Sequence, residues 1–306
     1  MRFIVVSVAL SLVATEALAT YSIAACDGDT GECGVAVATH NLAVGASVPF
    51  AEAGVGAGVS QFETNPIHKQ VILDVLRNES DAAQALQQAL ANDQKFSDGQ
   101  DKTFRQIGVV AYLGNVAAHT GAEAGPWAGH LLSNGVSIQG NGLWSKEVLS
   151  DMADAFEDAE GPLANRLLVA LEAGHAAGGQ TIGVTSAALL VSHPEGWPLD
   201  VNLRIDFSSP SAVEDLRRVY DARRAFDLMI RARNATRSGN LSEAQATVET
   251  ALTLAPQWDR IWLRAARLAE SWDDHETVAL RMCRFYEINP VWAKQLMSEK
   301  EVSVCK

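Results

Sequence analysis

The sequence has few basic residues for its size. Its 306 residues include 24 Lys and Arg against 37 Asp and Glu, so the formal net charge is −13. Nucleic-acid binders and proteins that bind anionic membranes depend on clustered Lys and Arg. The charge balance therefore argues against both kinds of partner, and the 48% of hydrophobic residues argues against a disordered chain.

Metal-binding patterns are also lacking. The sequence has four cysteines and seven histidines, but it has no CxxC motif, no HExxH motif and no other paired histidine spacing typical of a metal site. We therefore expect that the protein uses no metal ion and no other cofactor.

Long apolar runs are lacking except at the start of the chain. Arg2 precedes an apolar run over residues 3–13, which is about 11 residues long, whereas a membrane-spanning helix needs roughly 20. The tripeptide at 17–19, Ala-Leu-Ala, has the small-x-small pattern that signal peptidase cleaves. Residues 1–19 are therefore predicted to be a signal peptide, with an uncleaved anchor or a buried strand as alternatives. The protein is expected to be periplasmic or secreted, with no later membrane span.

Cleavage after Ala19 would make Thr20 the first residue of the mature chain. Its hydroxyl would then lie beside its own α-amine, whose ordinary pKa of about 7.7–8.0 allows it to accept the hydroxyl proton near neutral pH. Threonine paired with its own N-terminal amine is a recognised activated nucleophile. The competing interpretation is that Thr20 is only the first residue of an edge strand.

Export would place the four cysteines in a compartment that permits disulfides. Cys26 and Cys33 flank a turn-rich stretch between two alternating apolar runs, which predicts a hairpin closed by a disulfide. Cys283 and Cys305 are the candidates for a second bridge. Four inert, buried thiols are the alternative.

Charge is distributed unevenly along the chain. Residues 20–210 contain 8 basic and 22 acidic residues, a net charge of −14, whereas residues 211–306 contain 15 basic and 14 acidic residues, a net charge of +1. Two compositions in one chain predict two domains after the signal peptide, at 20–210 and at 211–306.

The first domain alternates groups of short strands with pairs of helices. Strands are expected at 20–25, 34–39, 44–49, 55–62, 104–112, 116–120, 136–139, 186–192 and 201–207. Helices are expected from Asn65 as N-cap to about residue 77, from Ser80 as N-cap to about residue 91, and near 146–158 and 162–177. This order of elements indicates an α+β domain with helices layered on sheets.

The second domain reads as helical throughout and contains a weak repeat. Pro256 and Pro290 are 34 residues apart, which is the period of tetratricopeptide repeats, and residues 238–244 resemble the turn inside such a repeat. We count two degenerate repeats, fewer than the three or so usually needed for independent stability, and expect a final helix near 292–297. Such repeats usually bind a peptide, so these helices are where a protein partner is expected.

The first domain resembles a bacterial family, domain-of-unknown-function family 1028, whose members are similar to N-terminal-nucleophile (Ntn) hydrolases. The resemblance covers nearly all of residues 20–206 in order. It rests on TYSIAA (20–25), GECGVAVA (31–38), VPFAEAGVGA (48–57), TNP (64–66), RQIGVV (105–110), AHTGAE (118–123), WAGH (127–130), SIQGN (137–141) and SAALLV (186–191). The resemblance implies a four-layer αββα sandwich, attack of a terminal hydroxyl on an amide carbonyl, and self-association as a homodimer.

That chemistry needs hydrogen-bond donors aimed at the developing oxyanion. The amide of Asn141 and the backbone of Gly140 are the candidates, with an ordinary Gly-Asn-Gly turn as the alternative. His119 and Glu123 are candidates for orienting the α-amine or binding substrate, although His119 also fits a buried histidine with satisfied hydrogen bonds. Three further residues lie at strand ends that would line the same cleft: His40, Ser60 and Gln61.

Two functions from different classes follow. The first is an exported amide hydrolase that acts on a small molecule or a peptide, with Thr20 as nucleophile and its α-amine as base. The second is a non-catalytic envelope protein that binds a partner through the tetratricopeptide-like helices. The net charge of −14 of the first domain should disfavour anionic substrates, unless the cleft itself is locally basic.

Overall fold

The computed structural model describes residues 19–95, 98–125 and 127–305. The chain divides into two compact units, Met1–Leu216 and Arg217–Lys306, and each is described by itself. The expected signal peptide lies outside the described residues, apart from Ala19. Among the helices within the described ranges, none combines the length and the apolar character needed to cross a membrane.

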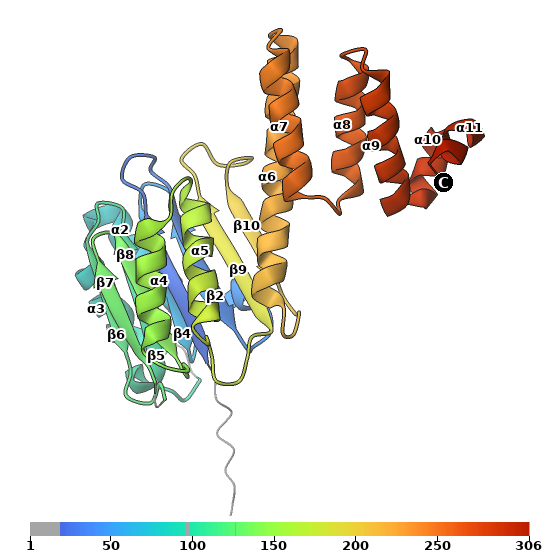
Figure 1. The fold of residues 1–306 in the computed structure, drawn as a ribbon. Helices are drawn as coiled ribbons and strands as arrows, with labels where there is room; N and C mark the ends of the chain where they lie inside the picture. Colours follow the sequence, from blue (N-terminus) through green and yellow to red (C-terminus); the bar gives the residue numbers. More distant parts are fainter. Residues whose placement is uncertain (1–18, 96–97, 126, 306) are drawn as a thin grey trace, which may run out of the picture. The chain divides into compact units, whose positions relative to one another are not determined.

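Two antiparallel sheets form the centre of the first unit (Figure 1). The larger sheet has the order β10-β9-β2-β1-β8-β7, made of β1 (Thr20–Cys26), β2 (Cys33–Thr39), β7 (Gly129–Ser133), β8 (Val136–Asn141), β9 (Ser186–Ser192) and β10 (Val201–Ile205). The smaller sheet has the order β3-β4-β5-β6, made of β3 (Pro49–Glu52), β4 (Gly56–Phe62), β5 (Arg105–Ala111) and β6 (Val116–Thr120). The predicted disulfide between Cys26 and Cys33 is present and closes the β1–β2 hairpin.

Helices cover the outer faces of both sheets. The pair α4 (Glu147–Asp158) and α5 (Leu163–Ala176) lies side by side over the larger sheet (Figure 1). The pair α2 (Pro66–Glu79) and α3 (Ala82–Ala91) packs on the smaller sheet, and both helices contact the short 3-10 helix η1 (Asp93–Lys95). A second 3-10 helix, η2 (Lys102–Phe104), directly precedes β5. The unit therefore has four layers. The expected domain of mixed α and β elements with helices layered on sheets is confirmed, and both sheets are antiparallel.

Apolar side chains fill the spaces between these layers. Val35 and Val37 of the larger sheet pack against Val59 and Val110 of the smaller sheet. A second cluster joins the smaller sheet to its two helices, with Phe50, Ile72, Leu76, Ala85, Ile107 and Val109 among its members. Removing apolar surface from water stabilises a fold by about 25 cal/mol per Å², and this is the main force that holds such layers together.

The ends of the first helix pair follow from their capping residues. Asn65 caps α2 as predicted, because its side chain accepts the N–H of Ile67, and Pro66 fits the first helical position. The prediction of Ser80 as the cap of α3 was wrong. Asp81 holds that position and its side chain accepts the N–H of Gln84, whereas Ser80 adopts a left-handed conformation at the end of α2.

Two strand predictions also differ from the structure. The strand expected at 44–49 is the short helix α1 (Val44–Ser47), with β3 beginning only at Pro49. The N–H of Val44 donates to the hydroxyl of Ser186, and the N–H of Val48 donates to the carbonyl of Val44, so the chain turns instead of extending. Strand β7 was missed because its side chains are mostly exposed and show no alternation.

The second unit is helical in its described part, as expected. Its helices are α6 (Ala212–Arg237), which starts in the first unit, α7 (Leu241–Leu254), α8 (Asp259–Glu270), α9 (His275–Ile288), α10 (Pro290–Leu296) and α11 (Glu299–Val304). Met229 and Ala232 of α6 share a core with Val248 of α7 and Ile261 of α8. The second expected disulfide, Cys283–Cys305, ties α9 to the residue that follows α11.

Candidate functional site

Strand β1 points its side chains alternately at two different layers, as a strand must. Ser22 faces the smaller sheet, where its hydroxyl donates to Oε1 of Gln61 at 2.7 Å. Tyr21 faces the outer helices, and its hydroxyl lies 3.3 Å from Nδ1 of His175 in α5. Burial raises the pKa of the Tyr21 phenol, which therefore stays neutral. Thr20 shares the face of Ser22 and is directed into the space between the sheets.

Thr20 lies between two polar partners on the neighbouring strands. It pairs with Thr39 of β2 on one side and with Asn141 of β8 on the other. Its backbone N–H donates to Oδ1 of Asn141 at 3.1 Å, and its Oγ1 lies 3.1 Å from Oγ1 of Thr39. The Thr39 hydroxyl donates to the carbonyl of Ala19 at 2.6 Å. The Thr20 hydroxyl must therefore be the donor in its contact with Thr39.

The Asn141 carboxamide is oriented by its neighbours. Its oxygen faces the Thr20 nitrogen, and its Nδ2 donates to Oε1 of Gln106 in β5 at 2.8 Å. This orientation suits Asn141 to hold the Thr20 nitrogen. Gly140 and Asn141 both lie inside β8 and not in a turn, and the carbonyl of Gly140 accepts from Nε2 of Gln106 at 2.8 Å. The chain turns only at Gly142, where φ is 56°.

A chain of neutral polar side chains continues from Gln106 between the two sheets. Nε2 of Gln61 donates to Oε1 of Gln106 at 2.8 Å, so the predicted residue Gln61 belongs to this group. Ser22 links Gln61 to Gln139, whose Nε2 donates to the Ser22 hydroxyl at 2.7 Å. Gly108 leaves room for this arrangement, because a Cβ there would lie 2.0 Å from Oε1 of Gln139. The side chains of the group carry no ionisable function.

Over the described ranges, no group of three or more His, Cys, Asp or Glu residues is placed to hold a metal ion.

His40 is a neighbour of the Thr20 contacts in the sequence. It directly follows Thr39, its side chain is exposed, and its backbone N–H donates to Oε1 of Gln180 at 3.0 Å. Nε2 of Gln180 donates in turn to the carbonyl of Ala38 at 3.1 Å, which fixes the end of β2. His40 is therefore at the surface, one residue from the contact partner of Thr20.

Exposed apolar side chains lie on the loops that follow these strand ends. Trp144 comes three residues after Asn141, is 65% exposed, and is held by a backbone hydrogen bond to Gly179 at 3.0 Å. Exposed apolar residues on the adjoining segments are Leu42, Trp127 and Ile182. The surface next to the ends of β2 and β8 can therefore cover an apolar group of a ligand.

His119 and Glu123 make their hydrogen bonds with the 3-10 helix η2. His119 is on the edge strand β6, where its Nε2 lies 2.7 Å from the carbonyl of Lys102. Glu123 is exposed in the loop after β6, and its backbone N–H donates to the carbonyl of Thr103 at 3.0 Å. Both residues are thus grouped with η2, and their contacts are not with Thr20.

Ser60 points away from Gln61, because consecutive strand residues face opposite sides. Its Oγ lies 3.0 Å from Nδ1 of His68, and Nε2 of His68 lies 3.0 Å from Oδ1 of Asp93. A catalytic Ser-His-Asp triad has the same order of groups. However, Ser60 is only 2% exposed and its oxygen accepts the N–H of Asn65 at 3.2 Å. We therefore interpret this group as structural and not as a nucleophile site.

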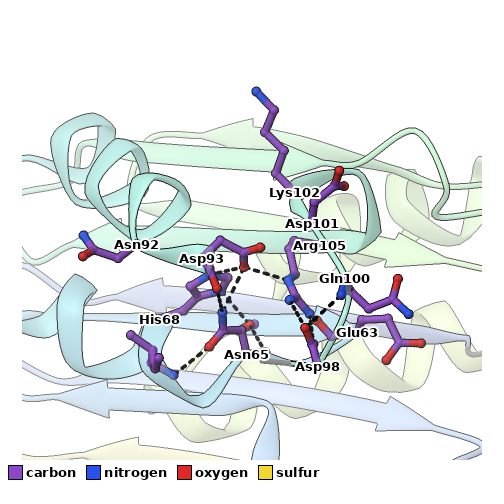
Figure 2. A network of polar contacts seen from close by, with 12 residues as sticks. Glu63, Asn65, His68, Asn92, Asp93, Asp98, Gln100, Asp101, Lys102 and Arg105 are labelled. Carbon is purple, nitrogen blue, oxygen red and sulfur yellow. Dashed lines mark hydrogen bonds and ion pairs between the residues drawn. The ribbon is translucent and has the colours of Figure 1, made fainter. Parts of the chain in front are cut away.

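Figure 2 shows the charged network that surrounds His68 and Asp93. Arg105 is fully buried, and its Nε donates to Oδ1 of Asp93 at 2.7 Å while Nη1 and Nη2 contact Asp98 at 2.8 and 3.0 Å. These hydrogen bonds hold the pKa of Asp98 below its ordinary value. Arg105 and Gln106 are consecutive in β5, so the network anchors the strand whose other face carries Gln106.

The His68 environment predicts a loss of stability in mild acid. Burial holds the pKa of His68 below its ordinary value, although the neighbouring Asp93 acts in the opposite direction. The unfolded chain therefore binds a proton at His68 more readily than the folded chain. The corresponding stability is present above about pH 6.5, the ordinary histidine value, and is lost as the pH falls below it.

Urea unfolding between pH 7.5 and 5.5 would measure this effect, with His68→Gln as the comparison. We expect the free energy of unfolding to fall more steeply with decreasing pH in the native protein than in the variant. Equal slopes would show that His68 does not contribute.

The site residues predicted from the sequence did not include Thr39 or Gln106. The Thr39 position could have been found, because the Cys26–Cys33 disulfide sets the register of the hairpin. Six residues back from Cys26 is Thr20, and six residues beyond Cys33 is Thr39. Gln106 gave no comparable signal, since its contact with Asn141 joins different sheets.

Comparison with known proteins covers the first unit. The family model described as a family of unknown function, DUF1028, matches residues 20–216. The crystal structure of protein SPO2555 from Silicibacter pomeroyi, described under the same family model, is 32% identical with a TM-score of 0.59. The similarity covers 66% of this chain and 88% of that chain. No curated protein matches the chain.

Proposed function

Because this chain belongs to the DUF1028 family, whose function is unknown, we propose an activity from the geometry around Thr20. The proposed activity is hydrolysis of an amide bond, with Thr20 as an N-terminal nucleophile. The observation that carries the proposal is the pair of contacts of Thr20, its nitrogen with Asn141 and its hydroxyl with Thr39. The family match also begins at Thr20.

Removal of the residues before Thr20 would create the reactive groups. The Thr20 nitrogen would become an α-amine that remains next to Oδ1 of Asn141. The Thr39 hydroxyl, which now donates to the carbonyl of Ala19, would become free to donate to a substrate. The space filled by Ala19 would then be open beside the nucleophile, and a substrate carbonyl would take the place of the Ala19 carbonyl.

The reaction follows from these positions. Oγ1 of Thr20 attacks the amide carbon while its proton passes to the α-amine, which Asn141 orients. The Thr39 hydroxyl donates to the negative oxygen that forms on the substrate. The C–N bond then breaks as the α-ammonium group gives its proton to the leaving amine. Water, deprotonated by the α-amine, attacks the resulting ester, and the carboxylic acid leaves with regeneration of Thr20.

The surroundings favour a neutral or cationic substrate with an apolar acyl group. The net charge of −14 over residues 20–210 repels anions, and Trp144 offers exposed apolar surface beside the end of β8. We also assign the four layers to the αββα sandwich of Ntn hydrolases. The support is the placement of one helix pair on the outer face of each sheet.

Mass spectrometry of the exported protein tests the proposal. We expect the mature chain to begin at Thr20, and a β-lactone probe to form an ester on that residue. The Cys26–Cys33 and Cys283–Cys305 disulfides support maturation in an oxidising compartment, as the periplasm or the extracellular space would provide. A mature chain that starts at another residue, or a probe attached elsewhere, would contradict the assignment.

A binding function is the second candidate, and the helix pairs of the second unit favour it. α7 is followed by Pro256, and Pro290 begins α10. The 34-residue spacing of these two prolines supports the assignment of the helices to tetratricopeptide-like pairs. In that case the protein would act as an adaptor without chemistry at Thr20. Thr20→Ala would then leave its biological function intact, whereas the nucleophile mechanism requires that function to be lost.

A further inference from the structure

A groove between α6 and α8 combines positive charge with apolar surface. It has a volume of about 320 Å³ and is lined by Met229, Ile230, Arg233, Arg264, Arg267 and Leu268, which we call the arginine groove. Residues at i, i+3 and i+4 share one face of a helix. The spacing therefore brings Arg264, Arg267 and Leu268 together on α8, and Met229 and Arg233 together on α6.

Among the described residues, no carboxylate forms an ion pair with the guanidinium groups of the groove. In residues 217–305, other arginines form ion pairs. Arg281 pairs with Glu249 at 2.6 Å, and Arg284 pairs with Glu287 at 2.6 Å. Within the same range, none of the groove arginines forms an ion pair, and neither does Arg260, one turn before Arg264 on α8.

Arg264 is the most constrained of these residues. It is half-buried, with its guanidinium carbon 4.3 Å from the centre of the Phe226 ring. Burial and the positive charges of Arg260, Arg233 and Arg267 lower the pKa of Arg264. Asp259, the acidic residue next to Arg260, accepts from Asn289 at 2.6 Å. Like charges at i and i+4 destabilise a helix, so an external anion would relieve a repulsion that the fold itself leaves in place.

We propose that the arginine groove binds an acidic peptide segment of a partner protein, with carboxylates on its guanidinium groups and an apolar side chain on its floor. Two parallel hydrogen bonds from one arginine to a carboxylate fix the orientation of the carboxylate, in addition to the attraction between the charges. The apolar floor of Met229, Ile230 and Leu268 suits a peptide better than a polyanion without apolar side chains. The overall charge of −13 also disfavours nucleic acid. This binding does not depend on chemistry at Thr20.

Fluorescence anisotropy with the full chain tests the proposal. The probe is a fluorescein-labelled peptide in which glutamate pairs alternate with leucine, at about 50 mM salt so that screening is weak. We expect saturable binding that weakens at least about tenfold when glutamine replaces glutamate in the peptide. The double variant Arg233→Glu, Arg267→Glu should weaken binding by at least the same factor. Both side chains are exposed and the substitutions remove a repulsion between like charges, so the thermal unfolding midpoint should be at least as high as that of the native protein.

The matched control is Arg284→Glu, Lys294→Glu, which changes the net charge equally on α9 and α10. Its affinity should remain close to that of the native protein. Equal losses in both double variants, equal binding of the glutamine peptide, or no binding would overturn the proposal. Tighter binding of an oligothymidylate that the groove variant abolishes would assign the groove to nucleic acid instead.

Discussion

Thr20→Ala is expected to lower the rate of ester formation with a β-lactone probe by roughly 10³-fold or more, because it removes the attacking oxygen. The substitution keeps the backbone nitrogen, so the hydrogen bond to Asn141 can still form. Thr20→Ser keeps both the hydroxyl and the α-amine and should retain labelling. Hydrolysis of a panel of chromogenic amides with apolar acyl groups should change in parallel.

The control for this series is Thr30→Ala, in the exposed loop between Cys26 and Cys33. It removes a threonine hydroxyl from the same hairpin but far along the strand from Thr20. Its labelling rate should equal that of the native protein. Each variant must first be shown by mass to begin at residue 20, so that a processing defect is not mistaken for a loss of chemistry. Undiminished labelling of Thr20→Ala would refute the nucleophile assignment.

Arg105→Met is expected to destabilise the first unit by about 3–5 kcal/mol, because it leaves the carboxylate of Asp93 buried without its cationic partner. Arg105 is fully buried and donates to both Asp93 and Asp98. A typical domain has a stability of about 5–15 kcal/mol, so this is a large fraction. Urea unfolding followed by circular dichroism would measure the loss.

Arg77→Met is the matched control for this substitution. Arg77 contacts Glu52 and Asp74 through hydrogen bonds of similar length, but all three side chains are substantially exposed. Exposed ion pairs contribute little, because water solvates the charges when the pair is broken. The unfolding midpoint should therefore barely move. A similar loss in both variants would show that burial is not the cause of the Arg105 effect.

The sequence predicted most of the local elements but not the contacts between them. Capping at Asn65 and the turn-rich loop between Cys26 and Cys33 are local signals, and both were interpreted correctly. The apolar run at 44–49 was misassigned because the N–H of Val44 bonds to Ser186, which is distant in the sequence. Short apolar runs do not distinguish a strand from a helical turn by composition alone.

For the candidate site, too, the sequence predicted local features better than contacts between distant segments. Thr20 and Asn141 were both predicted to belong to the site, and the structure pairs them on neighbouring strands. Ser60 and Gln61 were grouped together, although strand alternation alone sends one of them to each face of β4. Gln106 could not be predicted, because its place between Asn141 and Gln61 depends on how two sheets stack.

The burial of the peptide bond between Ala19 and Thr20 limits when this bond can be cleaved during maturation. Ala19 is 1% exposed and Thr20 is 4% exposed, and the Ala19 carbonyl is held by Thr39. A peptidase needs accessible backbone at its target, and β1 does not offer this once it is hydrogen-bonded to β2 and β8 on both sides. Under the proposed function, cleavage must therefore come before the hairpin joins the sheet. In a chain that folds before it is cleaved, Thr20 would stay buried and joined to Ala19. The relative rates of cleavage and folding would therefore decide how much active protein forms.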